Sequence, residues 1–325
     1  VALWSTWIFK EQIGAIHKLR FSSILVMSAL CAGMLFGDKI TDAADASLYA
    51  DDVILSRNTR YQRIVVTRWK DDIRLFLNSH LQFSSRDEYR YHEALVHPGL
   101  AAIKNPRRVL VLGGGDGLAV REILRYPAVE SITLVDLDPD MTVLFRNHSL
   151  LRRLNGDAFH NAKVRVVNAD AFPWLEQNPG QFDFVIIDFP DPTNYSLGKL
   201  YTTAFYRLLK RHLTDDALVS VQSTSPLFAR QSYWCIHESI KAAGLNTWPY
   251  HVYVPSFGEW GYVMAGKGNY TPPKVPAGLR YLNQTTLASM FEFPADMSAV
   301  PVEPNRLNDQ ALVRYYDKEW RDFSH

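Results

Sequence analysis

Short apolar runs recur along the middle of the chain and alternate with amphipathic stretches. The runs are typical of strands that are buried on both faces, at 109–113, 132–138, 164–170, 182–188 and 217–223. Helical periodicity occupies the intervals, near 118–126, 140–154, 201–212 and 230–243. Because strands and helices alternate, this region predicts a doubly wound parallel sheet.

Further elements are predicted on both sides of this region. Period-two alternation predicts three short strands, at 61–67, 72–78 and 80–84. A helix follows them, with Ser85 and Glu88 as a capping box and His97–Pro98 as its end. Two later runs predict an antiparallel hairpin at the sheet edge, at 248–254 and 260–266.

The N-terminal region carries a long stretch without charge. It covers residues 21–37, between Lys18 and Arg20 on one side and Asp38 and Lys39 on the other. As a helix it would span roughly 25 Å, the lower limit for crossing a bilayer. The stretch predicts a membrane helix, with a secretory signal and a buried helix as the alternatives. Because the chain begins with valine, we expect this segment to be the end of a longer membrane region.

The composition is that of a globular protein and narrows the possible partners. Of 325 residues, 35 are basic and 34 are acidic, which leaves a net charge of +1. Since no basic field is present, we expect no nucleic-acid partner. The two cysteines, Cys31 and Cys235, form neither a disulfide framework nor a Cys/His cluster. This usage indicates a reducing compartment and no metal site.

A glycine loop follows the first buried strand and opens a helix. Gly113, Gly115 and Gly117 give it the spacing GxGxG, and Leu118 stands where a dinucleotide fingerprint has its third glycine. Glycines let the backbone turn sharply and approach a ligand closely. The spacing disfavours NAD and favours an adenosyl-sulfonium nucleoside.

Four carboxylates lie at the ends of predicted strands, where α/β sheets bind ligands. They are Asp116, Asp136, Asp170 and Asp188. Asp136 is placed to hold both ribose hydroxyls, and Asp170 is placed to meet the adenine edge. Each of them alone is also typical of a solvated turn.

The glycine loop is one of five sequence blocks that occur along the chain. The blocks are TRYQRI (59–64), RDEYRYHEAL (86–95), VLVLGGGDGLAVRE (109–122), DFPDP (188–192) and LYTTAFYRLLK (200–210). Together they resemble the spermidine synthase, or polyamine aminopropyltransferase, family, from about Tyr49 to Lys267. VPSFGEWGYV (254–263) and the apolar N-terminus look like the membrane-associated branch of that family.

The resemblance implies an α/β fold with a Rossmann-like, methyltransferase-type doubly wound sheet. We expect four parts: an apolar membrane-associated segment (1–40), a small β-hairpin domain with a linking helix (48–105), a Rossmann-like catalytic domain (106–267) and a Pro-rich tail with short helices (268–325). Association with a membrane through 21–37, a cytoplasmic catalytic domain and a homo-oligomer, either dimer or tetramer, are the matching expectations.

The reaction implied by the resemblance moves an aminopropyl group from decarboxylated S-adenosylmethionine to a diamine such as putrescine and releases methylthioadenosine. An alkyl amine is protonated at pH 7, and removing its proton costs roughly 4–5 kcal/mol, so a base is required. By resemblance Asp188 is that base, Tyr91 hydrogen-bonds the attacking amine, and Asp191 holds the acceptor. Taken alone, the two aspartates of DFPDP would be turn formers.

Other residues are assigned to the two substrates by the same resemblance. The co-substrate set is Gln62, Gly113, Gly115, Asp116, Gly117, Asp136, Asp170 and Ala171. The acceptor set is Tyr91, His92, Asp191, Gln222, Phe257 and Glu259. Gln62 and Gln222 are also compatible with polar strand ends, His92 with a packed helix residue, and Glu259 with a solvated position.

Several positions depart from the family pattern. Asp136 stands where the family usually has glutamate, Ala171 replaces glycine, and Phe189 replaces serine or threonine. Phe257 replaces a tyrosine that touches the acceptor in many members, and Glu259 adds a carboxylate. These differences leave the identity of the acceptor open.

Asp116 separates the two enzyme interpretations. A carboxylate beside the glycine loop repels the carboxylate of S-adenosylmethionine but attracts the bare ammonium of the decarboxylated form. It therefore favours aminopropyl transfer over the first alternative, an S-adenosylmethionine-dependent N-methyltransferase of a small amine. The second alternative is a non-catalytic, membrane-associated module that binds polyamine or nucleoside.

Overall fold

The computed structural model describes residue 4, residues 7–8 and residues 16–323. The chain groups into two compact units, Val1–Arg57 with Val65–Ile73 and Asn58–Ile64 with Arg74–His325. Every residue assigned to a substrate in the sequence belongs to the second unit. The division of the chain at 105/106 and 267/268 stays a prediction.

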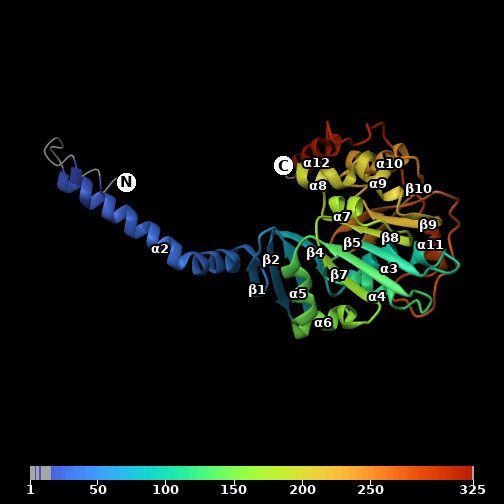
Figure 1. Ribbon diagram of the computed structural model, residues 1–325, viewed down its shortest axis with the longest axis horizontal. Coiled ribbons are helices and arrows are strands. Elements are labelled where there is room, and N and C mark those ends of the chain that lie inside the picture. Colours follow the sequence, from blue (N-terminus) through green and yellow to red (C-terminus); the bar gives the residue numbers. More distant parts are fainter. Residues whose placement is uncertain (1–3, 5–6, 9–15, 324–325) are drawn as a thin grey trace. The chain divides into compact units, whose positions relative to one another are not determined.

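A seven-stranded sheet forms the centre of the second unit (Figure 1). Its order is β10 (Asn246–Val254), β11 (Gly258–Gly266), β9 (Leu213–Gln222), β8 (Phe182–Asp188), β5 (Arg108–Gly113), β6 (Ser131–Asp136) and β7 (Val164–Asn168). The five strands from β9 to β7 are parallel, and β11 and β10 are added antiparallel at the edge. The predicted parallel sheet and its edge hairpin are therefore confirmed.

Helices cover both faces of this sheet (Figure 1). One face contacts α3 (Glu88–Leu100), and α4 (Leu118–Ile123) packs on that helix. The other face carries α7 (Ala171–Gln177), α9 (Thr203–Lys210) and α10 (Arg230–Ala242). The other helices described in the second unit are α5 (Pro139–Asn147), α6 (Ser149–Leu154), η1 (Ala158–His160), α8 (Tyr195–Gly198), η2 (Lys199–Tyr201), α11 (Gln284–Ser289) and α12 (Ala311–Phe323).

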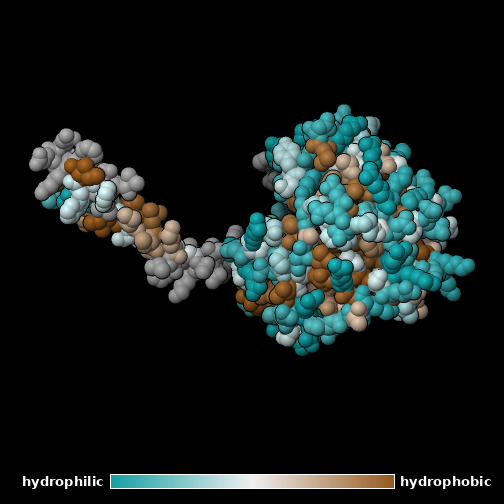
Figure 2. Space-filling view, viewed as in Figure 1, coloured by the Kyte–Doolittle hydropathy of each residue, from teal (hydrophilic) through white to brown (hydrophobic). Residues whose placement is uncertain are grey.

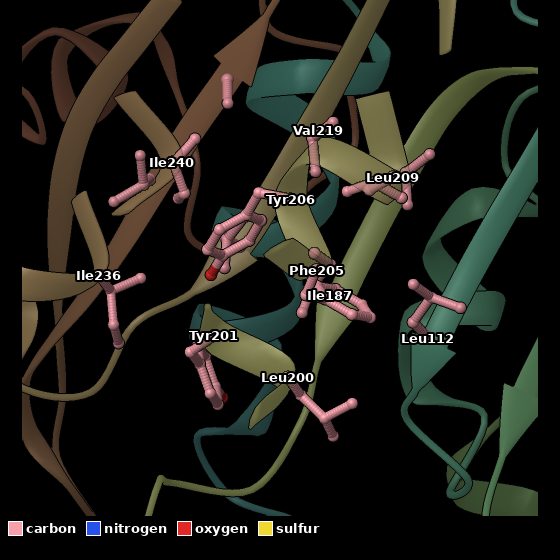
Figure 3. Packing of buried hydrophobic residues seen from close by; sticks show 14 of the residues in the cluster. Leu112, Ile187, Leu200, Tyr201, Phe205, Tyr206, Leu209, Val219, Ile236 and Ile240 are labelled. Carbon is pink, nitrogen blue, oxygen red and sulfur yellow. The ribbon is translucent and has the colours of Figure 1, made fainter. Parts of the chain in front are cut away.

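A hydrophobic core lies between the sheet and the helices α9 and α10 (Figure 3). Leu112 and Ile187 contribute from the strands, and Phe205 and Tyr206 contribute from α9. All four side chains are buried, so the strands β5 and β8 are held in place by close packing against α9. This packing fixes where the carboxyl ends of the strands lie.

A second sheet has the order β1 (Asp52–Asn58), β2 (Arg63–Trp69), β3 (Asp72–Leu77) and β4 (His80–Ser84). The three strands predicted there are β2, β3 and β4, whereas β1 was not predicted. Asn78 and Ser79 both have positive φ angles, 50° and 68°. Two such residues form the tight turn that joins β3 and β4 with the right twist.

The start and end of α3 correct the sequence interpretation. The helix begins at Glu88 and continues through Pro98 to Leu100. The predicted capping box of Ser85 and Glu88 does not form, because the Glu88 carboxylate binds the guanidinium of Arg121 and the ring of His92. The buried ion pair takes the side chain that a capping box needs.

The structure does not support the membrane helix predicted for the N-terminal region. Residues 21–37 are helical and form part of α2 (Ile16–Leu48). Apolar side chains such as Phe21, Ile24 and Leu25 are exposed on this helix, and Figure 2 shows apolar surface, in brown, along it. Over the described residues, however, we find no helix with the length and apolar character that crossing a bilayer demands.

Candidate active site

The glycine loop lies between two aspartates at the carboxyl ends of neighbouring strands. Gly113 pairs with Asp188 across β5 and β8, and a Cβ atom on Gly113 would lie 2.2 Å from the Asp188 main-chain oxygen. A Cβ atom on Gly115 would lie 2.7 Å from a carboxylate oxygen of Asp136. Gly113 also has a φ of 83°, which favours glycine. The loop can approach both aspartates this closely only because Gly113 and Gly115 lack side chains.

Asp116 sits inside this loop and is buried. Its Oδ1 accepts a hydrogen bond from the main-chain N–H of Leu118 at 2.9 Å, at the start of α4. The side-chain amide of Asn155 donates a hydrogen bond to the Asp116 main-chain oxygen at 2.9 Å and thereby fixes the backbone of the loop. Burial raises the pKa of Asp116, although the nearby His92 opposes the shift. A cation beside this carboxylate would relieve the cost of its burial.

Asp136 ends β6 and faces the same loop. Its Oδ1 accepts the main-chain N–H of Asp138 at 2.9 Å. Burial raises the pKa of Asp136 to about 7, and the negative charges of Asp138 and Asp116 add to the shift. Hydrogen bonds from a diol would favour the ionised form of this carboxylate.

Asp138 connects this group to the segment before β2. Its Oδ2 accepts from the hydroxyl of Thr59 at 2.8 Å and from the amide of Gln62 at 3.0 Å. Gln62 is therefore held close to the Asp136 strand end, while its role toward the co-substrate stays a prediction. Sequence analysis assigned no role to Asp138, although the repeated aspartates of Asp136–Leu137–Asp138 were a usable signal.

Asp188 and Tyr91 are joined by a short hydrogen bond. The Tyr91 hydroxyl, on α3, donates to Asp188 Oδ1 at 2.5 Å. Burial raises the pKa of Asp188 to about 6, and the charge of Asp116 contributes to the rise, while His92 and the Tyr91 hydrogen bond lower it. Burial also raises the pKa of Tyr91 well above its usual value. The phenol thus stays protonated, and the carboxylate is close to the range of a base that works at neutral pH.

Asp191 lies three residues beyond Asp188 along the chain, and its carboxylate accepts hydrogen bonds from neutral donors. Its Oδ1 accepts from the amide of Gln222 at 3.3 Å, and its Oδ2 accepts from the hydroxyls of Thr224 at 3.0 Å and Tyr316 at 2.9 Å. Burial raises the pKa of Asp191, and these hydrogen bonds oppose the rise. Such a carboxylate suits a cationic partner. Neither Thr224 nor Tyr316 was assigned a role from the sequence.

Aromatic rings line the space near these carboxylates. The Phe257 ring centroid lies 6.3 Å from that of Tyr91 and 5.2 Å from that of Trp260. The Trp260 indole N–H donates to Gln222 Oε1 at 3.2 Å. Aromatic faces of this kind favour methylene chains and cations. Phe257 and Gln222 are thus connected through Trp260, a residue that the sequence did not single out, and their role toward the acceptor stays a prediction.

Two predicted carboxylates have partners within the protein. Asp170 accepts the Phe172 N–H at the start of α7 and forms an ion pair of 2.5 Å with Lys199. Glu259 contacts His251 Nδ1 at 2.8 Å, and this contact helps to raise the pKa of His251 against the effect of burial. An adenine edge or a distal amine would therefore compete with these partners.

The other predicted residues have clear positions too. His92 binds Glu88 at 2.8 Å, and its ring packs against the ring of Tyr91 with centroids 5.0 Å apart. Ala171 is the buried first residue of α7. Within the described part of the chain, no group of three or more His, Cys, Asp or Glu side chains is arranged to hold a metal ion.

Comparisons with known proteins agree with this arrangement. Residues 88–275 match the family model of the spermine/spermidine synthase domain. A polyamine aminopropyltransferase of Leptospira interrogans is 58% identical over 321 residues, which are 98% of this chain and 64% of the relative. Polyamine aminopropyltransferase 2 of Ralstonia nicotianae is 52% identical and covers the same shares. The chain thus spans just under two thirds of the length of these curated relatives.

Solved structures share the fold. A spermidine synthase in complex with the transition-state analogue AdoDATO superposes with a TM-score of 0.70 at 27% identity, over 75% of this chain and 86% of that one. The spermidine synthase of Thermotoga maritima gives 0.68 at 26% identity, over 75% and 85%. With a family model that matches more than half of the sequence and relatives above 50% identity, the chain belongs to the spermine/spermidine synthase family.

Proposed function

We propose that the protein is a polyamine aminopropyltransferase that uses decarboxylated S-adenosylmethionine and an amine such as putrescine. The observation that carries this proposal is the 2.5 Å hydrogen bond between Tyr91 and Asp188 beside the glycine loop. It fixes the direction of a carboxylate whose pKa burial raises, at the place where the loop would hold a nucleoside. The family supports the same reaction through its curated members.

The reaction needs one proton transfer and one displacement. Asp188 takes a proton from the acceptor ammonium. The freed lone pair on nitrogen then forms a bond to the carbon of the aminopropyl group that is attached to the sulfonium sulfur. The carbon–sulfur bond breaks, its electron pair stays on sulfur, and methylthioadenosine leaves as a neutral thioether. The positive charge of the sulfonium passes to the product amine. The Tyr91 hydroxyl donates its proton to Asp188, keeps that carboxylate in line and can accept an N–H of the attacking nitrogen on its oxygen.

The co-substrate would bind along the strand ends of β5, β6 and β7. Asp136 is suited to the ribose diol, Gln62 is held next to it through Asp138, and Asp170 stands at the start of α7 where the adenine edge would lie. Asp116 would pair with the propylammonium end. Each role follows from the position of the carboxylate and from the positive or donor character of the ligand group it would meet.

The acceptor would bind on the other side of Asp188. Asp191 offers a buried negative charge that neutral donors hold in place. The rings of Phe257 and Trp260 would contact the methylene chain between the amines. Glu259 would meet a distal amine only by replacing His251. A homo-oligomeric state, expected from the resemblance, remains part of the proposal, to be tested by light scattering.

The test measures methylthioadenosine after incubation of the purified chain with decarboxylated S-adenosylmethionine and a panel of amines. Product that requires an amine supports the proposal, and Asp188→Asn should lower kcat by about 10²- to 10⁴-fold. Asp215→Asn is the matched control, because Asp215 is fully exposed at the opposite end of β9. S-adenosylhomocysteine formed from S-adenosylmethionine would instead indicate a methyltransferase. Binding of both ligands without either product would indicate a non-catalytic module.

A further inference from the structure

The C-terminal helix α12 reaches the loop that carries Asp191. The hydroxyl of Tyr316 donates to Asp191 Oδ2 at 2.9 Å, and the Tyr316 side chain is buried. Tyr316 lies outside residues 88–275, the part of the chain that matches the family model. A residue beyond the shared domain thus contacts a carboxylate in the middle of it.

The position of α12 is set by contacts on two sides. The Glu319 carboxylate accepts the main-chain N–H groups of Gln231 and Ser232 at 2.5 and 3.1 Å, and the Ser232 hydroxyl at 2.7 Å. Leu312 is fully buried in the main core. Because one end of the helix holds the start of α10 and the other end is packed in the core, Tyr316 has little freedom to move away.

The segment just before α12 is joined to the loop after Asp191. The side-chain amide of Asn305 donates to the Gly198 main-chain oxygen at 2.8 Å, and its main-chain oxygen accepts the N–H of Thr203 at 2.9 Å. A Cβ atom on Gly198 would lie 2.5 Å from a methyl carbon of Val313. The chain 189–203 is therefore held against the C-terminal region at Asp191, Gly198 and Thr203.

We infer that α12 is a built-in support of the acceptor site and that Tyr316 is a positioning residue for Asp191, on which acceptor affinity depends. The inference rests on the proposed function, because it takes Asp191 as the group that holds the acceptor amine. Tyr316 supplies one of the three neutral hydrogen bonds that orient this carboxylate and favour its ionised form. It has no such contact with the co-substrate residues.

The variant Tyr316→Phe removes one oxygen atom and keeps the packed ring. We expect the KM for the acceptor to rise roughly tenfold, the usual scale for one hydrogen bond to a charged group. The KM for decarboxylated S-adenosylmethionine should stay unchanged, and thermal unfolding shows whether the fold is intact. Tyr315→Phe is the matched control, because the neighbouring Tyr315 hydroxyl contacts the main chain of Glu303 and no site residue.

The pH dependence separates positioning from packing. Groups that act on Asp191 include Tyr316 on α12, Tyr201 in η2 and His80 on β4. Loss of the Tyr316 hydrogen bond removes an effect that lowers the Asp191 pKa, so the acidic limb for acceptor kcat/KM should move to higher pH. A simple packing defect would lower the rate at every pH.

A double-mutant cycle decides whether Tyr316 acts through Asp191. In an Asp191→Asn background, Tyr316→Phe should change acceptor kcat/KM by less than twofold, since the charge it orients is gone. An equal loss in both backgrounds, or an unchanged acceptor KM in Tyr316→Phe alone, would overturn the inference. If the wild-type chain releases no methylthioadenosine, the proposed function fails first, and direct calorimetric binding of putrescine to wild type and Tyr316→Phe still tests the contact.

Discussion

The two halves of the site are built in different ways. The co-substrate half consists mainly of strand ends and one glycine loop, so its main parts lie within β5, β6 and the residues that follow them. The acceptor half brings together α3, the DFPDP loop, the end of β9, the β10–β11 hairpin and α12. The first half depends on backbone geometry, whereas the second depends on side chains from distant segments. Changes should therefore act on the two halves with different signatures.

The largest effect should come from the glycine loop. An alanine at Gly113 would have to adopt a left-handed conformation, at a cost of about 1–2 kcal/mol, and its Cβ would overlap the main chain of Asp188. We expect Gly113→Ala to lower the free energy of unfolding by more than that amount and to abolish product formation. Gly268→Ala is the control, because a Cβ atom there would meet nothing within 4 Å. Urea unfolding and a methylthioadenosine assay measure both; equal behaviour of the two variants would contradict the geometry.

A smaller effect is expected at Asp136, again on the co-substrate half alone. Asp136→Glu adds one methylene and pushes the carboxylate toward Gly115, where the space is already tight. One misplaced methylene typically changes binding by about tenfold. The KM for decarboxylated S-adenosylmethionine should change by that order, in either direction, while the KM for the acceptor stays constant. A change confined to the acceptor would show that the two halves are not separate.

The smallest effect concerns the charge of Asp116, in the co-substrate half, and its influence on the pKa of Asp188. Because the pKa of Asp188 is raised to about 6 and its ionised form is the proposed base, the rate should fall as the pH drops through that region. The charge of Asp116 contributes to the raised value, after burial. Asp116→Asn should therefore move the acidic limb of kcat to lower pH, measured at saturating substrates. A limb that moves to higher pH would mean that Asp116 does not act on Asp188 as a negative charge.

The same contrast explains what could be predicted from the sequence. The five parallel strands and the edge hairpin follow from local periodicity, and Gly113 and Asp136 follow from their place at strand ends. The partners of Asp191 could not be found in this way. Thr224 and Tyr316 reach it across 33 and 125 residues of sequence, and no local pattern encodes such contacts.

One incorrect prediction has a related origin. Glu88 has the spacing of a capping residue, yet a tertiary contact with Arg121 determines where its carboxylate goes. The local pattern gave the helix correctly and the partner of the Glu88 carboxylate wrongly.

The raised pKa of the Asp136 carboxyl has a consequence for how a nucleoside binds. With a pKa raised to about 7, this group is partly protonated at neutral pH before anything is bound. Hydroxyl groups that donate to it stabilise its anion, so association with a sugar diol would expel hydrogen ions into the surrounding buffer. Affinity for the nucleoside would consequently strengthen toward alkaline conditions, and the heat of association would vary with the buffer chosen.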